Sequence, residues 1–382
     1  MRTPDQAAMM HNLLTEDLMK TRATIFFAAM AMILGFMSVG TALAQGKLEK
    51  ELVVRSEGHE ELLLMLKKEF QKLHPETDVI ITNMDSSVSY KKSFSEMPNP
   101  QADILTTKKY FFIQGLADSQ KMLGYPMFEK YLSPERKRLN PALLDKEGYY
   151  QTERWGARAI LYHAAAEKKH GPIDSFADLL KWKGTFDYPN PITTGAGFSA
   201  IQTMIQDFPK DKSGTQQEIW KRGYENPVGG VEYAALLKKA HPEMSHAGTS
   251  PMGQQFARGD IDAMWNFDIW YYQGVIQDGM KIKAVYPKEG TIISTNDVGI
   301  LKNCQHPKAA RAWIDFVLSK PIQTLFMEKT YYRTAAKDVP IPAAMKKIEI
   351  SHPERINLEV DEEYVAKRTK EYKALWEEKV TK

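Results

Sequence analysis

The sequence has 382 residues, of which 43% are hydrophobic and 26% are charged, and it carries a formal net charge of +3. This length and composition predict a globular protein with enough chain for two domains that each have a hydrophobic core. So small a net charge argues against a nucleic-acid-binding protein, which usually has a concentrated basic face.

The N-terminal segment predicts export. Lys20 and Arg22 precede an apolar run over residues 25–39, and residues 42–44 (ALA) have the small-x-small pattern of a signal peptidase site. The apolar run is shorter than the ~20 residues that a membrane span needs. We therefore expect residues 1–44 to be a cleaved signal peptide, with an uncleaved anchor as the alternative.

Two details of this segment extend the expectation. The residues before Met19 lack the basic start of a signal peptide, so translation is expected to begin at Met19. Cleavage would fall before Gln45, and no lipoprotein cysteine follows it. The single cysteine, Cys304, cannot form a disulfide within this chain. The mature protein is expected to be free and soluble in the periplasm.

The chain after the signal is expected to alternate strands and helices. Residues 51–54, 78–82 and 102–106 are short apolar runs that predict strands. A helix between the first two is predicted by apolar residues at i, i+3, i+4, i+8 and i+11, namely Leu62, Met65, Leu66, Phe70 and Leu73. Strands joined by long helical connections predict a parallel sheet.

The loops after these three strands are candidates for a binding site. They read RSEGHE at residues 55–60, NMDSSVSY at 83–90 and TTKKYF at 106–111. Ligands of parallel sheets collect at the carboxyl ends of the strands. Three small, polar loops at one edge therefore favour a site, whereas any one of them could be an ordinary solvated turn.

The second part of the chain continues the alternation. A buried strand is expected within residues 154–171, then a helix and a strand within 175–189, and a helix after Gly195. Further predicted elements are a helix at 227–242, a strand at 263–266 with a helix after it, two strands within 282–304, two helices broken at Pro321, and a charged helical tail from Lys346.

One loop matches a dinucleotide-binding pattern but does not fit it in context. Gly195, Gly197 and Ala200 fit G-x-G-x-x-G/A, yet five residues, including Pro191, separate the first glycine from the strand that ends at Pro189. A nicotinamide enzyme is therefore not expected. A helix that begins at these glycines, after Thr194, instead offers unpaired backbone N–H groups to an anion, and simple capping by the threonine is compatible with that role.

An ordered set of motifs resembles a known family. The set is ELVVRSEGHEELLLMLKKEF, NPQADIL, KGTFDYPNPITTGAGFSAI, FARGDIDAMWNFDIWYY and TNDVGILKNCQHPKAARAWIDFVLSKPIQTLFMEK. It is similar to the family 1 extracellular solute-binding proteins of bacterial ABC importers, near the branches for ferric iron, thiamine, polyamines and phosphonates. The resemblance implies an α/β fold, the two-lobed periplasmic binding protein fold of type II. Each lobe would be a mixed, mostly parallel sheet flanked by helices, and two strands would form the hinge.

The resemblance also implies a domain organisation. Lobe 1 would comprise residues 46–156 and 292–345, and lobe 2 would comprise residues 157–291. The hinge crossings would fall near 155–162 and 284–298. Residues 346–382 would form a helical tail that packs on the lobes.

The positions that meet the ligand in this family map onto three regions of this chain and a late loop. The expected ligand-binding residues are Ser56, Glu57, Gly58, His59, Ser86, Ser87, Thr194, Gly195, Ala196, Gly197, Asp268, Tyr271, Tyr332 and Arg333. Trp265, Phe267 and Trp270 are expected in the core rather than against the ligand.

Several solutes remain open. A small organic anion, such as a phosphonate, phosphate ester or carboxylate, is favoured by the helix start, the serine loops, and Arg158 or Arg333 as charge partners. Ferric iron would use His59, Tyr271 and Tyr272, but these tyrosines lie two places later than the family's pair. A polyamine or thiamine is the remaining alternative, for which Asp268 would be suited.

The resemblance implies a transport role without catalysis. The expected protein is a monomer that needs no cofactor and delivers its solute to an inner-membrane ABC permease with its ATPase. A subunit that presents ligand to a membrane sensor kinase is an alternative from another class. A secreted hydrolase is disfavoured because neither G-x-S-x-G nor H-E-x-x-H occurs.

Overall fold

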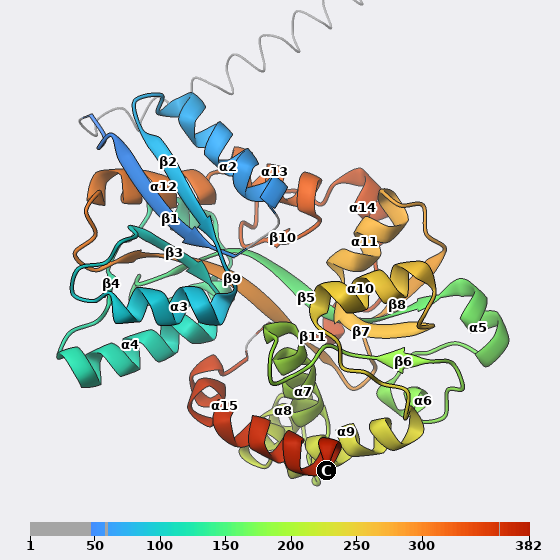
Figure 1. The fold of residues 1–382 in the computed structure, drawn as a ribbon. Coiled ribbons are helices and arrows are strands. Elements are labelled where there is room, and N and C mark those ends of the chain that lie inside the picture. The colour runs from blue at the N-terminus through green and yellow to red at the C-terminus, as the bar shows by residue number, and fades with distance from the viewer. Residues whose placement is uncertain (1–46, 58–59, 359) are drawn as a thin grey trace, which may run out of the picture. The chain divides into compact units, whose positions relative to one another are not determined.

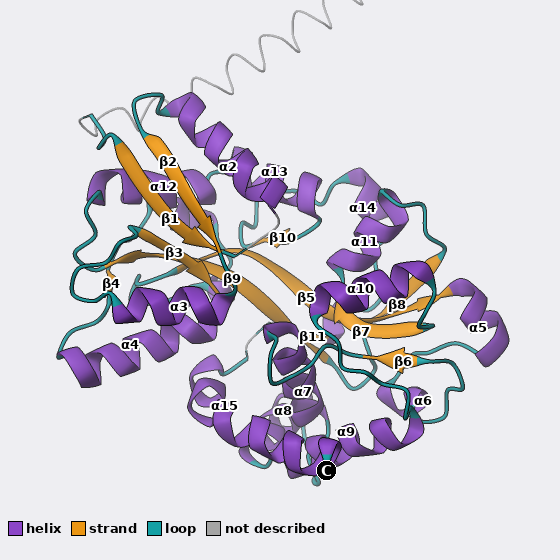
Figure 2. Ribbon diagram, viewed as in Figure 1, coloured by secondary structure: helices purple, strands orange, loops and turns teal. Residues whose placement is uncertain are grey.

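A mixed β-sheet with helices on its faces organises the chain (Figures 1 and 2). The computed structural model describes residues 47–57, 60–358 and 360–382, so the expected signal peptide, Gly58 and His59 lie outside the described residues. Residues Glu49–Lys382 form one compact unit, and the description below concerns this unit. None of its described helices combines the length and apolarity needed to cross a bilayer.

The strands of this sheet alternate with helices along most of the chain. The strands are β1 (Glu51–Ser56), β2 (Asp78–Asn83), β3 (Ile104–Thr107), β4 (Phe128–Glu129), β5 (Gln151–His163), β6 (Phe186–Asp187), β7 (Ala263–Phe267), β8 (Ile282–Val285), β9 (Thr291–Leu301), β10 (Arg333–Thr334) and β11 (Ile356–Asn357). The helices are α2 (Glu60–Leu73), α3 (Ser86–Ser95), α4 (Lys109–Leu123), α5 (Ala164–His170), α6 (Phe176–Leu179), α7 (Gly195–Asp207), α8 (Gln216–Glu225), α9 (Val228–Ala240), α10 (Thr249–Arg258), α11 (Ile269–Ile276), α12 (Pro307–Leu318), α13 (Lys320–Thr330), α14 (Ala343–Lys347) and α15 (Glu362–Trp376).

The strand order is β2-β1-β3-β9-β5-β7-β6, with β4, β8, β10 and β11 paired at its sides. β1 lies parallel to both β2 and β3, and β6 lies parallel to β7. β9 is antiparallel to β3 and β5, and β5 is antiparallel to β7. The α/β class and the mixed sheet predicted from the sequence are confirmed, with parallel pairing toward the two ends and antiparallel pairing in the centre.

Two long strands connect the two ends of the sheet. The first half of β5 pairs with β9, where Trp155 lies opposite Thr295. The second half of β5 pairs with β7 and β8, where Ile160 lies opposite Trp265 and Val285. In Figure 1 both strands run through the middle of the molecule. The segments expected to cross between lobes therefore lie largely within long, paired strands.

Each end of the sheet has its own hydrophobic core. At the β1–β3 end, Leu105, Phe112 and Phe128 are among the buried side chains of one cluster. At the β6–β7 end, Trp265 and Met204 belong to a larger cluster. Each end of the sheet therefore has buried apolar side chains of its own among the described residues, and β5 and β9 link the two ends.

The helix predicted after the first strand illustrates how local pattern and packing agree. In α2, Leu62, Leu66 and Phe70 are buried as expected. Leu73, however, is 47% exposed, because it lies in the last turn before His74. The apolar stripe therefore anchors most of the helix, but not its C-terminal turn.

Candidate functional site

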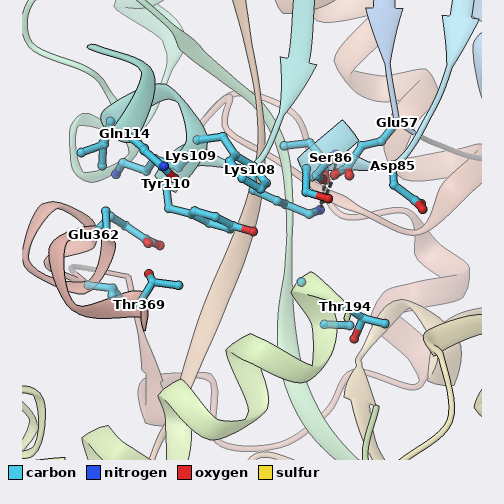
Figure 3. A pocket seen from close by; sticks show the side chains of 18 of the residues that line it. Glu57, Asp85, Ser86, Lys108, Lys109, Tyr110, Gln114, Thr194, Glu362 and Thr369 are labelled. Carbon is cyan, nitrogen blue, oxygen red and sulfur yellow. Dashed lines mark hydrogen bonds and ion pairs between the residues drawn. The ribbon is translucent and has the colours of Figure 1, made fainter. Parts of the chain in front are cut away.

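A cleft of about 1800 Å³ lies where the two ends of the sheet face each other. Helices α3, α4, α7, α10 and α15 each begin at residues that line this cleft. The first turn of a helix presents backbone N–H groups without helical partners and carries the positive end of the helix dipole. The first turns of α4, α7 and α10 carry no acidic residue, so these starts favour negative charge in the cavity. The start of α15 is already capped by the Asp361 carboxylate and followed by Glu362 and Glu363. Figure 3 shows side chains from several of these elements around the opening.

The start of α7 is the best-defined of these helix ends. The Thr194 side chain accepts a hydrogen bond of 2.9 Å from the backbone N–H of Gly197 and so caps the helix. Thr194, Gly195 and Ala196 line the cleft. Capping uses the N–H of the third residue, which leaves the N–H groups of Gly195 and Ala196 available at the cleft surface.

A closed polar triad lies on the opposite wall. Lys108 Nζ is 2.8 Å from Glu57 Oε1 and donates to Asn296 Oδ1 at 2.9 Å. Asn296 Nδ2 donates to the same Glu57 oxygen at 2.9 Å. These residues come from the loop after β1, the start of α4 and the centre of β9. The triad fixes Lys108 in the cleft beside its counter-ion (Figure 3).

Arg154 adds a buried cation to the floor. Its side chain is 2% exposed, forms an ion pair with Glu153, and donates to the Glu57 carbonyl at 3.3 Å. The guanidinium lies 5.4 Å from the ring centres of both Phe326 and Tyr332, within cation–π range. Burial lowers the pKa of Arg154, and its Nε has no acceptor among the described residues.

Arg158 lies beneath the first turn of α7 with no carboxylate partner in the described part of the chain. It is fully buried and donates to the Ala196 carbonyl and, at 3.4 Å, to Asn266 Oδ1. Its guanidinium lies 4.6 Å from the Phe267 ring centre. Burial lowers its pKa to about 9, which still leaves it charged at neutral pH. A buried charge of this kind favours an anion nearby.

The remaining wall is formed by α4 and α15. Tyr110 on α4 and Glu362 on α15 both point into the cleft (Figure 3). Burial raises the pKa of Glu362 to about 7, and Lys109 opposes that shift. Burial also raises the pKa of Tyr110, with Glu57 adding to the effect. Both groups therefore face the cavity largely or partly protonated near neutral pH.

The structure brings half of the residues predicted from the sequence together at the cleft. Those on its lining are Glu57, Ser86, Ser87, Thr194, Gly195, Ala196 and Tyr332. Ser56 and Gly197 lie next to lining residues but are not on the lining themselves. Phe267, expected in the core, is buried in a small apolar cluster against which Trp270 packs, and both residues also line the cleft. Trp265 is fully buried in the larger core.

Asp268 and Arg333 pair with each other away from the lining of the cleft. Asp268 is fully buried, its Oδ1 accepts from the Ala157 backbone N–H at 3.2 Å, and its Oδ2 pairs with Arg333. Tyr286 donates to the same carboxylate at 2.9 Å. Burial alone would lower the pKa of Arg333, but the Asp268 carboxylate raises it. Both charges are thereby neutralised within the protein.

The tyrosines considered for iron also lie off the cleft lining. Tyr271 is partly buried, and its ring centre is 5.4 Å from that of Tyr272. The Tyr272 hydroxyl accepts from Arg333 at 3.1 Å. Within the described residues, which exclude His59, no group of three or more histidine, cysteine or acidic residues is placed to hold a metal ion.

Several lining residues were missed by sequence reasoning, chiefly Lys108, Tyr110, Arg154, Asn296 and Glu362. The loop that contains Lys108 was a candidate as a whole, and its lysines were the available signal. Arg154 and Asn296 lie inside strands, where an isolated polar residue among apolar ones was the signal. Glu362 lies in the charged tail, where nothing distinguished it from its neighbours.

A model of the bacterial extracellular solute-binding protein family matches residues 66–350. A curated but uncharacterised protein of Haemophilus influenzae is 24% identical over 253 residues, which cover 63% of this chain. The matched region spans 65% of that relative, so slightly over a third of the relative has no counterpart in the match.

Solved structures with the same fold include three binding proteins. The periplasmic binding protein AfuA from Actinobacillus pleuropneumoniae, with fructose-6-phosphate bound, is 20% identical, with a TM-score of 0.68 over 87% of this chain and 99% of that one. Iron-bound HitA from Pseudomonas aeruginosa is 16% identical, with a TM-score of 0.65 over 85% of this chain and 99% of HitA. A periplasmic thiamin binding protein is 15% identical, with a TM-score of 0.68 over 87% of this chain and 96% of that protein. At these identities the likeness establishes the fold and not the solute.

Proposed function

Since the chain belongs to the bacterial extracellular solute-binding protein family, we propose that it captures a small organic anion in the cleft and delivers it to an ABC importer. The family consists of solute-binding transport proteins and not of enzymes. The proposed location is the periplasm, and the proposed partner is an inner-membrane permease with its ATPase.

The proposed ligand is a phosphonate, phosphate ester or carboxylate. The observation that carries this choice is the start of α7, where Gly195 and Ala196 line the cleft. Beneath this turn and off the lining lies Arg158, a fully buried cation with no carboxylate partner among the described residues. Its charge and the free N–H groups of Gly195 and Ala196 favour the same sign of ligand at the same place. Arg154 and Lys108 also line the cleft, but each is already paired with a carboxylate, Glu153 and Glu57 respectively.

Two lobes that close around the ligand are part of the proposal. Lobe 1 would comprise residues 46–156 and 292–345, and lobe 2 residues 157–291. Separate cores at the two ends of the sheet, linked by β5 and β9, support this division. Part of the binding free energy would then shift the equilibrium from an open to a closed form.

Calorimetric titration of the purified protein tests the choice of solute. The probes are phosphate esters such as fructose 6-phosphate, a phosphonate, citrate, thiamine, spermidine and ferric iron. We expect at least one organic anion to bind with micromolar affinity, about −8 kcal/mol. Tight binding of thiamine, spermidine or free ferric iron, with no response to the anions, would refute the proposal.

A charge-removing variant sharpens the test. Arg158→Gln keeps hydrogen-bonding capacity toward the Ala196 carbonyl but removes the buried charge. We expect roughly tenfold weaker anion binding, about 1.4 kcal/mol. Arg258→Gln, which removes an exposed arginine paired with Asp260, is the matched control and should bind as the wild type does. Circular dichroism and melting curves verify that both variants are folded.

A further inference from the structure

The C-terminal helix α15 forms one wall of the cleft. It is anchored to the β6–β7 end of the sheet, where Trp376 Nε1 donates to the Tyr188 hydroxyl at 2.9 Å and Tyr372 donates to the Tyr224 carbonyl at 2.8 Å. Val365 is buried in the same core. From this anchor the helix also packs against α4, which belongs to the other end of the sheet. It lies beyond residue 350, where the match to the family model ends.

The face of α15 that is not anchored lines the cavity. Its lining residues recur at helical spacing and include Glu362, Ala366, Thr369 and Lys373. Side chains three and four positions apart share one face of a helix. The helix therefore presents one continuous strip to the cleft, and Glu362 is its first residue. In Figure 3 Glu362 projects from α15 toward Tyr110 of α4.

Glu362 also borders a small chamber beside the main cavity. The chamber has a volume of about 20 Å³, and Lys109, Tyr110, Gly195 and Ser199 are among its other lining residues. A space of ~10–15 Å³ is enough for one water-sized group. Gly195 belongs to the α7 start to which the anion is assigned. The chamber thus has the α7 start and Glu362 on its lining, and a substituent that enters it from a ligand held at α7 would lie beside Glu362.

The charges around Glu362 restrict what this substituent can be. Lys109 on α4 places positive charge near the Glu362 carboxyl group, while Asp297 on β9 and Asp361, the N-cap of α15, add negative charge. A second anionic group would be repelled by Asp361 and by the ionised fraction of Glu362, and a cationic group would be repelled by Lys109. An uncharged hydrogen-bond donor meets neither repulsion and gives a carboxyl oxygen of Glu362 a hydrogen bond to accept.

We infer that Glu362 is a specificity-determining residue that accepts a hydrogen bond from a hydroxyl group of the bound anion. This inference rests on the proposed function and narrows it to hydroxylated organic anions, such as sugar or polyol phosphates. It also gives the C-terminal helix a direct part in ligand recognition, beyond packing on the rest of the chain.

Titration calorimetry on paired probes tests the inference. The hydroxylated probes are fructose 6-phosphate, glucose 6-phosphate and glycerol 3-phosphate, and the probes without hydroxyl groups on carbon are ethyl phosphate and inorganic phosphate. The wild type should prefer the best hydroxylated probe by tenfold or more. Glu362→Leu should abolish that preference, because the hydroxylated probe loses one hydrogen bond. The affinity of this variant for ethyl phosphate should stay within about threefold of the wild-type value.

Two further variants keep the result interpretable. Glu362→Gln retains an acceptor oxygen at nearly the same shape, so it should keep part of the preference even if Glu362→Leu fails to fold. Glu378→Gln removes an exposed carboxylate from the same C-terminal segment and should behave as the wild type does. An unchanged preference in both Glu362 variants would overturn the inference while leaving the proposed function intact. No binding of any anion by the wild type would overturn the proposed function, and the inference with it.

Discussion

Asp207 illustrates how a single buried carboxyl group makes stability depend on pH. It is the last residue of α7 and is 2% exposed. Its Oδ1 accepts from Gln206 Nε2 at 2.9 Å, whereas its Oδ2 is buried without a hydrogen bond in the described part of the chain. Burial raises its pKa from 3.8 to about 8. The folded protein therefore holds this proton more tightly than the unfolded chain does.

The consequence is a loss of stability as pH rises. Between pH 3.8 and about 8 the unfolded chain releases the proton and the folded protein keeps it. The free energy of unfolding should fall over this range, by at most ~1.4 kcal/mol per pH unit. Asp207→Asn should remove this contribution and gain stability relative to the wild type as pH increases.

Urea unfolding at pH 5, 6.5 and 8 measures the effect. Asp278→Asn is the control, because Asp278 is exposed. In this variant the free energy of unfolding should change with pH as it does in the wild type. Equal pH slopes for Asp207→Asn and the wild type would show that Asp207 is ionised in the folded protein.

The sequence identified site residues where the signal was local. Thr194, Gly195 and Ala196 could be predicted because a threonine followed by small residues and an apolar helical pattern indicates a capped helix N-terminus. Lys108 could not be assigned, since its partner Asn296 is 188 positions away. Asp268 and Arg333 were expected at the ligand, because nothing in the sequence reveals that the two charges pair with each other.

At the scale of one element, the two glycines that open α7 have different structural roles. A Cβ on Gly197 would lie 2.3 Å from the carbonyl atoms of Asn190 and the carbonyl oxygen of Pro189, which are backbone and cannot rotate away. A Cβ on Gly195 would meet nothing within 4 Å. Gly197 is thus required by the close approach of the preceding loop, and Gly195 is required by neither packing nor backbone conformation.

Alanine substitutions separate these roles. Gly197→Ala should lower the free energy of unfolding by about 1–3 kcal/mol or more, because the clash forces the backbone to move. Gly195→Ala should be neutral or stabilising by up to ~1 kcal/mol through helix propensity. Denaturant unfolding of both variants is the measurement. Equal stability of the two variants would contradict the assigned close approach.

Helices and strands could be predicted from the sequence where the spacing of neighbouring residues determines them, and less well where pairing with distant segments does. The apolar face of α2 follows from residue spacing, and three of its five predicted members are buried. The 13-residue length of β5 was not evident, because two different sets of strands pair with its two halves. The tail was predicted as a helix, but its contact with α4 depends on the tertiary fold and could not be read from the sequence.

For the whole molecule, the buried pair of Asp268 and Arg333 connects the two ends of the sheet. Arg333 lies on β10, which pairs with β5 at Trp155, and Asp268 precedes α11 at the other end. Because Asp268 also accepts from the backbone of Ala157, the pair lies at the middle of β5. Because the pair lies beside the strand about which the proposed lobes would move, and off the lining of the cleft, we expect it to stabilise both the open and the closed forms.

This position predicts an effect on stability without an effect on binding. Arg333→Met would leave the Asp268 carboxylate buried without its charge partner, at a cost of about 3–5 kcal/mol. Adding Asp268→Asn removes the stranded charge, so the double variant should recover part of that loss. Both variants should keep the affinity of the wild type for organic anions and its ligand-induced increase in melting temperature. If either residue instead contacts the solute, as the family resemblance implied, affinity would fall at least tenfold in a variant that remains fully folded, and the pair would belong to the binding site.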